Sequence, residues 1–285
     1  MPIPFIKVQG AGNDFVLVDG RRREVDWASL APAVCDRHFG VGSDGLLVIA
    51  DSERAPVQMV MYNPDGSEAE MCGNGIRCFV KYVVEQGGVA APDGRLDVET
   101  GAGVLATSFD AGLSSIDRVR VAMGEPRFEP AEIPVAVEGA GPVTDLALTV
   151  EGMELSLTCV SMGNPHAVLF TETPVATFPL ERIGPAVEHH ALFPERTNFE
   201  IVNVLSRDHL QVRVWERGAG LTMACGTGAC AAQAAARVRD IGAERATLSL
   251  PGGDLDVEWS GSGTSYLEGP AAYVFEGEWS SNGHA

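Results

Sequence analysis

Two cysteines of this sequence stand in the same short context, far apart in the chain. Cys72 begins the segment Cys-Gly-Asn-Gly and Cys225 begins Cys-Gly-Thr-Gly, and a stretch with helical patterning follows each. Both thiols are therefore predicted at helix N-termini. Unpaired backbone N–H groups and the helix dipole favour negative charge there, which lowers the pKa of a thiol and lets the same turn hold a carboxylate. Each turn offers a base and an anion site together.

The two cysteine segments belong to an internal repeat. At an offset of 153 residues, segment 57–75 aligns with segment 210–228 without a gap. The identical pairs are Gln58/Gln211, Cys72/Cys225, Gly73/Gly226 and Gly75/Gly228. A second match pairs 12–15 with 163–166 at an offset of 151. We interpret the chain as two related halves.

Two thiols on opposite sides of one carbon can invert a stereocentre. One thiolate removes a proton while the other thiol delivers one to the opposite face, and donors at two helix N-termini stabilise the carbanion-like transition state. With only Lys7 and Lys81 as lysines, pyridoxal phosphate is hard to place. The competing interpretation is thiol redox chemistry, which also uses a lowered thiol pKa but more often a local C-x-x-C pair.

Composition narrows the class of protein. The 285 residues are 45% hydrophobic, which suits one large or two modest globular domains. The 20 basic and 39 acidic residues give a net charge of −19, which disfavours nucleic acid and anionic membranes as partners. We find no apolar run long enough to span a bilayer and no signal-peptide pattern, so a cytoplasmic protein is expected. The six cysteines form no C-x-x-C pair and are expected to be thiols without metal.

The patterning predicts a mixed α+β fold with more strand than helix. One helix follows Cys72 and stops at Gly87-Gly88, and an alanine-rich helix follows Cys225 and stops near Gly242. Alternating apolar residues predict strands at 3–8, 14–18, 45–50, 96–99, 103–108, 117–122, 145–150, 154–159, 167–170, 200–205 and 246–250. In each repeat a further strand is expected before the polar, glycine-rich loop that leads to the cysteine, and a last strand is expected at 271–275.

Five segments carry a resemblance to a known family: GAGNDF (10–15), YNPDGSEAEMCGNGIRC (62–78), GNPHAV (163–168), RTNFE (196–200) and ERGAGLTMACGTGAC (216–230). They closely resemble the diaminopimelate epimerases, cofactor-independent enzymes of lysine and cell-wall precursor synthesis. The resemblance implies interconversion of LL- and meso-diaminopimelate, with no cofactor and no metal. It also implies two pseudo-symmetric lobes, each a curved, mostly antiparallel sheet around a central helix, with the active site in the cleft between them. The expected lobes are 1–123, joined by a returning strand at about 270–278, and 124–269, in a cytoplasmic homodimer.

The resemblance assigns roles by position. Cys72 and Cys225 are the two acid/base thiols, and His166 and Glu216 assist them. Arg217 suits the distal carboxylate of the substrate, because a guanidinium binds a carboxylate through two parallel hydrogen bonds. The substrate-binding set implied is Asn13, Asn63, Gly73, Asn74, Asn164, Asn198, Glu216, Arg217, Gly226 and Thr227.

Two positions depart from the family pattern, and one rival shares it. Gly45 stands where family members often have Gln, and Leu221 stands where they often have Glu, so position 45 is left out of the site and Leu221 is expected to alter loop packing. The nearest rival is a proline or hydroxyproline racemase with the same paired cysteines. Asn74 and Arg217 argue against it, because a cyclic imino acid has no distal carboxylate. The tail 280–285 is expected to be disordered.

Overall fold

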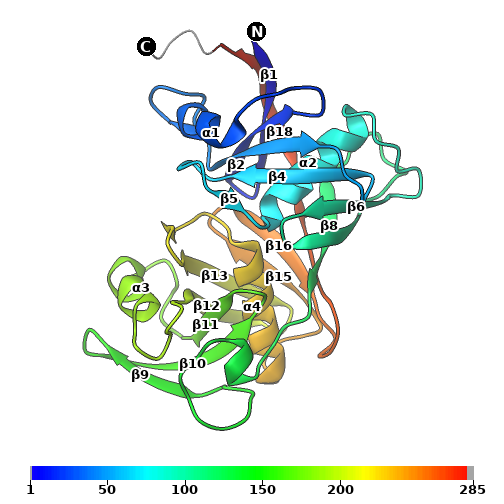
Figure 1. Ribbon diagram of the computed structural model, residues 1–285. Coiled ribbons are helices and arrows are strands. Elements are labelled where there is room, and N and C mark those ends of the chain that lie inside the picture. Colours follow the sequence, from blue (N-terminus) through cyan, green and yellow to red (C-terminus); the bar gives the residue numbers. More distant parts are fainter. Residues whose placement is uncertain (1, 281–285) are drawn as a thin grey trace. The chain divides into compact units, whose positions relative to one another are not determined.

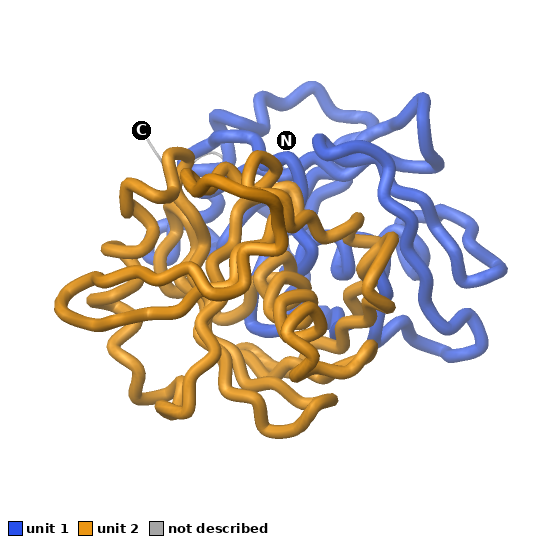
Figure 2. The backbone as a smooth tube through the Cα atoms, turned by 90° about the horizontal axis from the view of Figure 1, so that it is seen from below, with its two compact units in different colours: residues 1–121, 269–285 blue, residues 122–268 orange. Residues whose placement is uncertain are grey.

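The structure, a computed structural model, describes residues 2–280. Residues 281–285, which belong to the tail expected to be disordered, lie outside the described residues. The chain divides into two compact units, shown in two colours in Figure 2. Unit 1 comprises Met1–Val121 and Gly269–Ala285, and unit 2 comprises Ala122–Glu268. Each unit contains one of the two cysteine turns.

Unit 1 is a mixed sheet around one long helix. Its elements are β1 (Ile3–Gly10), β2 (Asn13–Asp19), α1 (Trp27–Cys35), β3 (Gly45–Ala50), β4 (Val57–Tyr62), β5 (Glu68–Ala69), α2 (Gly73–Glu85), β6 (Arg95–Thr100), β7 (Gly103–Ser108) and β18 (Ala272–Trp279). Strand β1 pairs antiparallel with both β2 and β18, and the pairs β3/β4 and β6/β7 are also antiparallel. The pairs β2/β3 and β4/β6 are parallel. Helix α2 lies among these strands (Figure 1).

Helix α2 is central because ten of its thirteen residues are buried. Ile76, Phe79, Val80 and Val83 have no exposed surface and share one face of the helix, at the spacing i, i+3, i+4 and i+7. Cys78 lies on the opposite face and is also fully buried, so other elements surround the helix. This packing anchors the turn at Cys72 to the rigid part of unit 1.

Unit 2 repeats the plan with different residues. Its elements are η1 (Pro130–Glu132), β9 (Leu146–Val150), β10 (Met153–Ser161), β11 (Pro165–Phe170), α3 (Leu180–Glu188), β12 (Asn198–Ser206), β13 (His209–Glu216), β14 (Gly220–Leu221), α4 (Gly226–Val238), β15 (Arg245–Leu250) and β16 (Gly253–Glu258). Strands β8 (Arg118–Gly124) and β17 (Ser265–Pro270) run across the points at which the units divide. The pairs β11/β12 and β13/β15 are parallel, and β9/β10, β10/β11, β12/β13 and β15/β16 are antiparallel. Helix α4 lies among these strands, and its run of small side chains is fully buried at Ala231, Ala232 and Ala234–Ala236 (Figure 1).

The two units are related as the repeat predicts. Helices α2 and α4 are both 13 residues long and begin 153 residues apart, at Gly73 and Gly226. The parallel pair β2/β3 corresponds to β11/β12, and β4/β6 corresponds to β13/β15. The α+β prediction and the duplicated helix starts are confirmed.

The sequence analysis missed several elements, among them two helices and two strands. Helices α1 and α3 contain Pro32 and Pro185 in their interiors, which lowers their intrinsic helix propensity. Tertiary packing overrides propensity in α3, because its apolar residues lie in the core of unit 2. Strands β16 and β17 were missed for another reason. Their apolar residues alternate, but both contain acidic residues and glycine, which are uncommon in strands.

Candidate active site

Cys72 caps the N-terminus of α2. Its Sγ accepts a hydrogen bond from the backbone N–H of Gly75 at 3.4 Å, and its thiol donates to Asn13 Oδ1 at 3.7 Å. Asn74 Nδ2 donates to the same oxygen at 3.3 Å. Asn13 begins β2, after a turn in which Ala11 and Gly12 both have positive φ. The structure therefore brings together Cys72, Asn13 and Asn74.

The fully buried Arg77 fixes this first turn. Its guanidinium donates to the Gly73 carbonyl at 2.9 Å, to Asn74 Oδ1 at 2.8 Å and to the Pro270 carbonyl at 3.1 Å. Because Asn74 Oδ1 accepts from Arg77, its amide nitrogen is turned toward Asn13. Arg77 is a supporting residue that the sequence analysis did not name.

A charged cluster holds the other end of Asn13. Asn13 Nδ2 and the Asp14 backbone N–H donate to Asp44 Oδ2 at 2.6 and 3.1 Å. Asp14 in turn forms ion pairs with Lys7 and Arg37. Burial acts to raise the pKa of Asp14, but hydrogen bonds and charge from these two cations lower it on balance. The cluster keeps Asn13 in place through charged groups outside the predicted site.

Asn63 lies at the end of β4, in a turn closed by its own side chain. Its Nδ2 donates to Ser67 Oγ at 3.0 Å, and its backbone N–H donates to the Ser67 carbonyl. The neighbouring Asp65 carboxylate accepts from the backbone N–H and hydroxyl of Ser67. In this structure Asn63 acts as a turn residue.

Cys225 caps α4 in the same geometry. Its Sγ accepts from the Gly228 backbone N–H at 3.4 Å and lies 3.5 Å from Thr227 Oγ1. Asn164 Nδ2 donates to Thr227 Oγ1 at 3.4 Å. Asn164 thus occupies in unit 2 the place that Asn13 has in unit 1, with a threonine hydroxyl between amide and thiol.

His166 is fully buried behind Asn164. Its Nε2 lies 3.0 Å from Asn164 Oδ1, and its Nδ1 lies 2.7 Å from Glu200 Oε1. The structure therefore links His166 to the Cys225 turn through Asn164 and Thr227. Glu200 was not predicted; the available signal was a single acidic residue inside the otherwise apolar strand segment 199–202.

The expectation of a lowered thiol pKa is wrong for Cys225 in this structure. Burial raises its pKa well above the ordinary value, and the charge of Glu216 raises it further. The hydrogen bonds from Thr227 and the Gly228 N–H act in the opposite direction but are outweighed. A helix N-terminus supplies only partial charges, whereas the removal of water and the charge of a nearby carboxylate act more strongly.

Glu216 and Arg217 lie where β13 turns into the loop before β14. Glu216 Oε1 accepts from Thr222 Oγ1 at 2.6 Å, and Arg217 Nη1 donates to the Glu195 carbonyl at 3.0 Å. Asn198 Oδ1 accepts from the Arg217 backbone N–H at 2.9 Å. The side chains of Glu216 and Arg217 are both partly exposed, so a ligand could contact them.

Two buried side chains hold this loop. The amide of Asn198 spans it, because Nδ2 donates to the Pro165 carbonyl at 2.8 Å while Oδ1 holds Arg217. Glu188 accepts from the Gly218 N–H at 2.9 Å and from Trp215 Nε1 at 2.7 Å. In this structure Asn198 supports the loop from within the fold, and Glu188, not named from the sequence, does the same.

Of the two departures from the family pattern, the one at Gly45 has a structural reason. A Cβ at Gly45 would lie 3.0 Å from both the Tyr62 carbonyl oxygen and the Met61 methyl, so β3 passes too close to β4 for a larger residue there. Leu221 is 40% exposed on the short strand β14.

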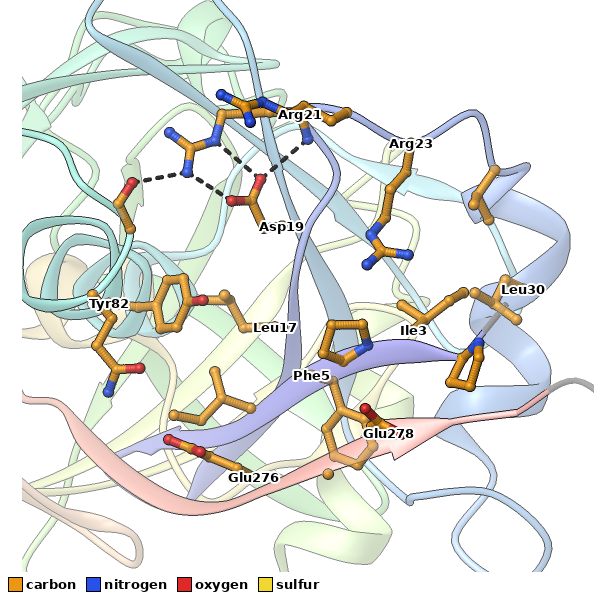
Figure 3. A pocket seen from close by; sticks show the side chains of 18 of the residues that line it. Ile3, Phe5, Leu17, Asp19, Arg21, Arg23, Leu30, Tyr82, Glu276 and Glu278 are labelled. Carbon is orange, nitrogen blue, oxygen red and sulfur yellow. Dashed lines mark hydrogen bonds and ion pairs between the residues drawn. The ribbon is translucent and has the colours of Figure 1, made fainter.

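A cavity of about 1600 Å³ opens elsewhere in unit 1, and it contains none of the predicted site residues. Figure 3 shows it between Phe5 and Leu17 on one side and Arg23 on the other, with Asp19 and Arg21 ion-paired at its edge.

Within residues 2–280 we find no cluster of three His, Cys, Asp or Glu side chains arranged to hold a metal ion. No helix among those residues is long and apolar enough to cross a membrane.

Comparison with solved structures identifies the class of fold. The hydroxyproline epimerase from Agrobacterium vitis superimposes with a TM-score of 0.71, at 13% identity, over 97% of this chain and 92% of that one. The fold is thus the two-lobed fold of the racemases and epimerases that this neighbour represents. At this identity the likeness concerns the fold alone.

Sequence comparison is more specific. The family model described as diaminopimelate epimerase matches residues 5–129 and 158–274. The diaminopimelate epimerase of Moorella thermoacetica is 49% identical over 277 residues, covering 96% of this chain and 98% of that protein. That of Desulfitobacterium hafniense is 48% identical over 276 residues, with 95% and 96% covered. The chain belongs to the diaminopimelate epimerase family.

Proposed function

We propose that this protein interconverts LL- and meso-diaminopimelate by a two-base mechanism that uses Cys72 and Cys225 and no cofactor. Family membership and relatives of 48–49% identity over nearly the whole chain support the reaction. The observation that carries the mechanism is the duplicated turn, in which each thiol caps a buried helix and accepts from the N–H three residues on. The lobes proposed for this activity are 1–123 with about 270–278, and 124–269.

The chemistry balances across the two thiols. The thiolate of one cysteine takes the α-proton as the C–H bond breaks, and the thiol of the other gives its proton to the opposite face of the carbon. The two cysteines have then exchanged protonation states, and this form catalyses the reverse reaction. Another turnover in the same direction requires the first cysteine to lose its proton and the second to regain one by exchange with solvent. The backbone N–H groups of Gly73-Asn74 and Gly226-Thr227 are placed to hold the α-carboxylate, because they lie in the first turns of α2 and α4.

The raised pKa of Cys225 suggests its role at rest. A thiol with a pKa well above its ordinary value is protonated at neutral pH. Cys225 is then the proton donor in the resting form, and Cys72 is the base that takes the first proton. His166 acts behind Cys225 through the amide of Asn164.

The distal end of the substrate needs groups that the reacting end does not use. Diaminopimelate carries a second ammonium and a second carboxylate, for which Glu216 and Arg217 are the matching charges. Asn13, Asn63, Asn164 and Asn198 complete the proposed binding set with neutral amides. Arg217 supplies the contact that a cyclic imino acid could not use.

The remaining proposals concern the setting of the protein. We place the reaction in the cytoplasm, in the synthesis of lysine and peptidoglycan precursors, and we propose a homodimer. Light scattering coupled to size-exclusion chromatography tests the dimer, and a mass of one chain of 30.1 kDa would contradict it.

The reaction is tested by isotope exchange in heavy water. Reduced protein without added cofactor is incubated with LL-diaminopimelate and, separately, with L-proline, and α-proton exchange and stereochemistry are followed by NMR. We expect deuterium to enter diaminopimelate as the meso isomer forms. Exchange with proline alone, or with neither compound, would refute the proposed substrate.

A further inference from the structure

Glu200 is a buried titratable group with no role in the mechanism so far. Its side chain is fully buried on β12, with Oε1 2.7 Å from His166 Nδ1. Its second oxygen, Oε2, is also buried and has no hydrogen-bond partner among residues 2–280. Burying a charged carboxylate costs free energy when one of its oxygens accepts no hydrogen bond. The surroundings of Oε2 therefore bear on whether Glu200 is protonated.

The internal repeat shows that this pair belongs to one half of the protein only. In β11 and β12, His166 pairs with Asn198 and Val168 with Glu200. In the corresponding strands β2 and β3, Phe15 pairs with Gly45 and Leu17 with Leu47. Phe15 and Leu47 thus occupy in unit 1 the places of His166 and Glu200, and both are fully buried. Apolar side chains satisfy the fold at these positions, so the fold alone does not require the polar pair.

The hydrogen bonds of His166 locate its protons. Asn164 Nδ2 donates to Thr227 Oγ1, so the carbonyl oxygen of the amide faces His166 Nε2. A carbonyl oxygen can only accept, and Nε2 therefore carries a hydrogen. One further proton lies on the bond between Nδ1 and Glu200 Oε1, either on the nitrogen or on the oxygen.

The unpartnered oxygen decides between these two positions. A proton on Glu200 Oε1 makes the carboxyl neutral and leaves Oε2 as a weakly charged carbonyl oxygen, which an apolar interior tolerates better than a carboxylate. The charged and titratable groups that face Glu200 are His166 from β11, Glu216 from β13 and Cys225 from α4. Burial raises the pKa of Glu200, and the charge of Glu216 acts in the same direction against the attraction of His166.

We propose that Glu200 is a positioning residue for Cys225: at rest it is protonated and donates from Oε1 to neutral His166, and it passes that proton to Nδ1 when Cys225 becomes a thiolate. The O–H bond at Oε1 breaks as the N–H bond at Nδ1 forms, and no proton enters or leaves the pair. This inference rests on the proposed two-thiol mechanism.

The geometry explains how a buried carboxyl can affect the thiol. Glu200, His166, Asn164 and Thr227 form one chain in which every donor points toward the sulfur, because Thr227 accepts from Asn164 and keeps its own proton for Cys225. Aligned hydrogen bonds of this kind strengthen one another. The proton transfer makes Glu200 a carboxylate and His166 a positive imidazolium. His166 is the nearer of the two to the new thiolate along the hydrogen-bonded series, and the net charge of the pair stays constant.

Kinetics of Glu200→Gln test the transfer. The glutamine amide can still donate to neutral His166 Nδ1 but cannot release a proton, so the resting geometry is kept and the response to a thiolate is lost. We expect kcat to fall by about 10- to 100-fold, the size found when partners behind a functional histidine are removed, with KM within about twofold. Glu154→Gln, at an exposed position of β10, is the matched control and should keep both constants. An unchanged kcat in Glu200→Gln, or loss of binding alone, would refute the proposal.

Nitrogen NMR of the histidines gives a readout that does not depend on activity. In substrate-free protein labelled at histidine, His166 should show the neutral tautomer with the hydrogen on Nε2 near pH 7. In Cys225→Asp, whose carboxylate mimics the thiolate, His166 should become imidazolium. An imidazolium in the resting protein, or a neutral ring in Cys225→Asp, would overturn the inference. Failure of the proposed reaction would instead appear as no isotope exchange in diaminopimelate while these signatures persist.

A double variant separates folding from function. His166→Phe combined with Glu200→Leu copies the arrangement at Phe15 and Leu47, so unit 2 should fold with a circular dichroism spectrum like that of the parent. We expect this variant to lose at least as much kcat as Glu200→Gln. A folded double variant with parental kcat would show that the pair has no part in turnover.

Discussion

The glycines three residues after each cysteine offer a matched test of the two turns. A Cβ added at Gly228 would lie 2.9 Å from Glu200 Oε1 and 3.3 Å from Cys225 Sγ. A Cβ added at Gly75 would meet the Leu47 Cδ2 methyl at 3.2 Å and Cys72 Cβ at 3.4 Å. An added Cβ is therefore crowded in both units. In unit 2 it meets a carboxyl oxygen fixed by a hydrogen bond, and in unit 1 it meets a methyl group that can rotate away.

The magnitude follows from two opposing terms. Alanine gains roughly 0.5–1 kcal/mol over glycine in a helix, and overpacking a buried site costs about 1–3 kcal/mol. In Gly75→Ala the leucine methyl can move, so the two terms should nearly cancel. In Gly228→Ala the Glu200 oxygen is held by His166 and cannot retreat without breaking its hydrogen bond. We expect a net loss of about 1–2 kcal/mol for Gly228→Ala, because the overpacking term exceeds the helix term.

Thermal unfolding and steady-state kinetics measure the two consequences together. A loss of this size should lower the melting temperature by about 2–4 °C for each kcal/mol in a protein of this length. Gly228→Ala should also lower kcat, because the displaced carboxyl no longer supports His166, whereas Gly75→Ala should keep the parental melting temperature. Equal melting temperatures for the two variants would show that Glu200 is not held as the structure indicates.

Three further predictions follow from the site. Replacing either Cys72 or Cys225 by Ala should reduce kcat by at least about 10²- to 10⁴-fold, the contribution of a positioned proton-transfer group, with a parental circular dichroism spectrum; near-normal turnover in either variant would contradict the two-base mechanism. Arg217→Lys loses the paired hydrogen bonds to the distal carboxylate and should raise KM about 10-fold or more, since hydrogen bonds to charged groups contribute roughly 1.5–3 kcal/mol, and an unchanged KM would place that carboxylate elsewhere. Asp14 has a pKa below its ordinary value of 3.8, so its ion pairs stabilise the fold above that value and this stabilisation is lost as pH falls through the lower, folded-state pKa. The difference in urea stability between parent and Asp14→Asn should therefore shrink between about pH 5 and about pH 2, and a constant difference would refute the linkage.

Strands and the two central helices were readable from local patterns. The alternation that predicted 45–50 and 103–108 coincides with β3 and β7, because a strand buried on one or both faces must repeat its apolar residues with the period of the pleat. Helices with a proline inside, such as α3, escaped because their stability comes from core packing and not from propensity. The length of these helices could not be inferred before their partners in the core were known.

The motifs named the duplicated glycine turns, Asn13, Asn74, Asn164 and His166 as site residues, and their roles stay predictions. The structure adds their contacts: Asn13 and Asn74 lie at the Cys72 turn, and Asn164 joins His166 to the Cys225 turn. The charged cluster of Lys7 and Arg37, the guanidinium of Arg77 and the carboxyl of Glu200 could not be assigned to the site, because their neighbours in space are set by the fold.

Sequence alone determined the family, the duplication and the two helix-capping thiols, because these depend on residue identity and on spacing along the chain. Only the tertiary structure decided how each thiol is surrounded. The pKa of Cys225 is set mainly by burial and by the charge of Glu216, and the position of the proton in the His166–Glu200 pair is set by one carboxyl oxygen without a partner. Solvation and through-space charge depend on the distances between residues far apart in the chain, so motif spacing cannot supply them.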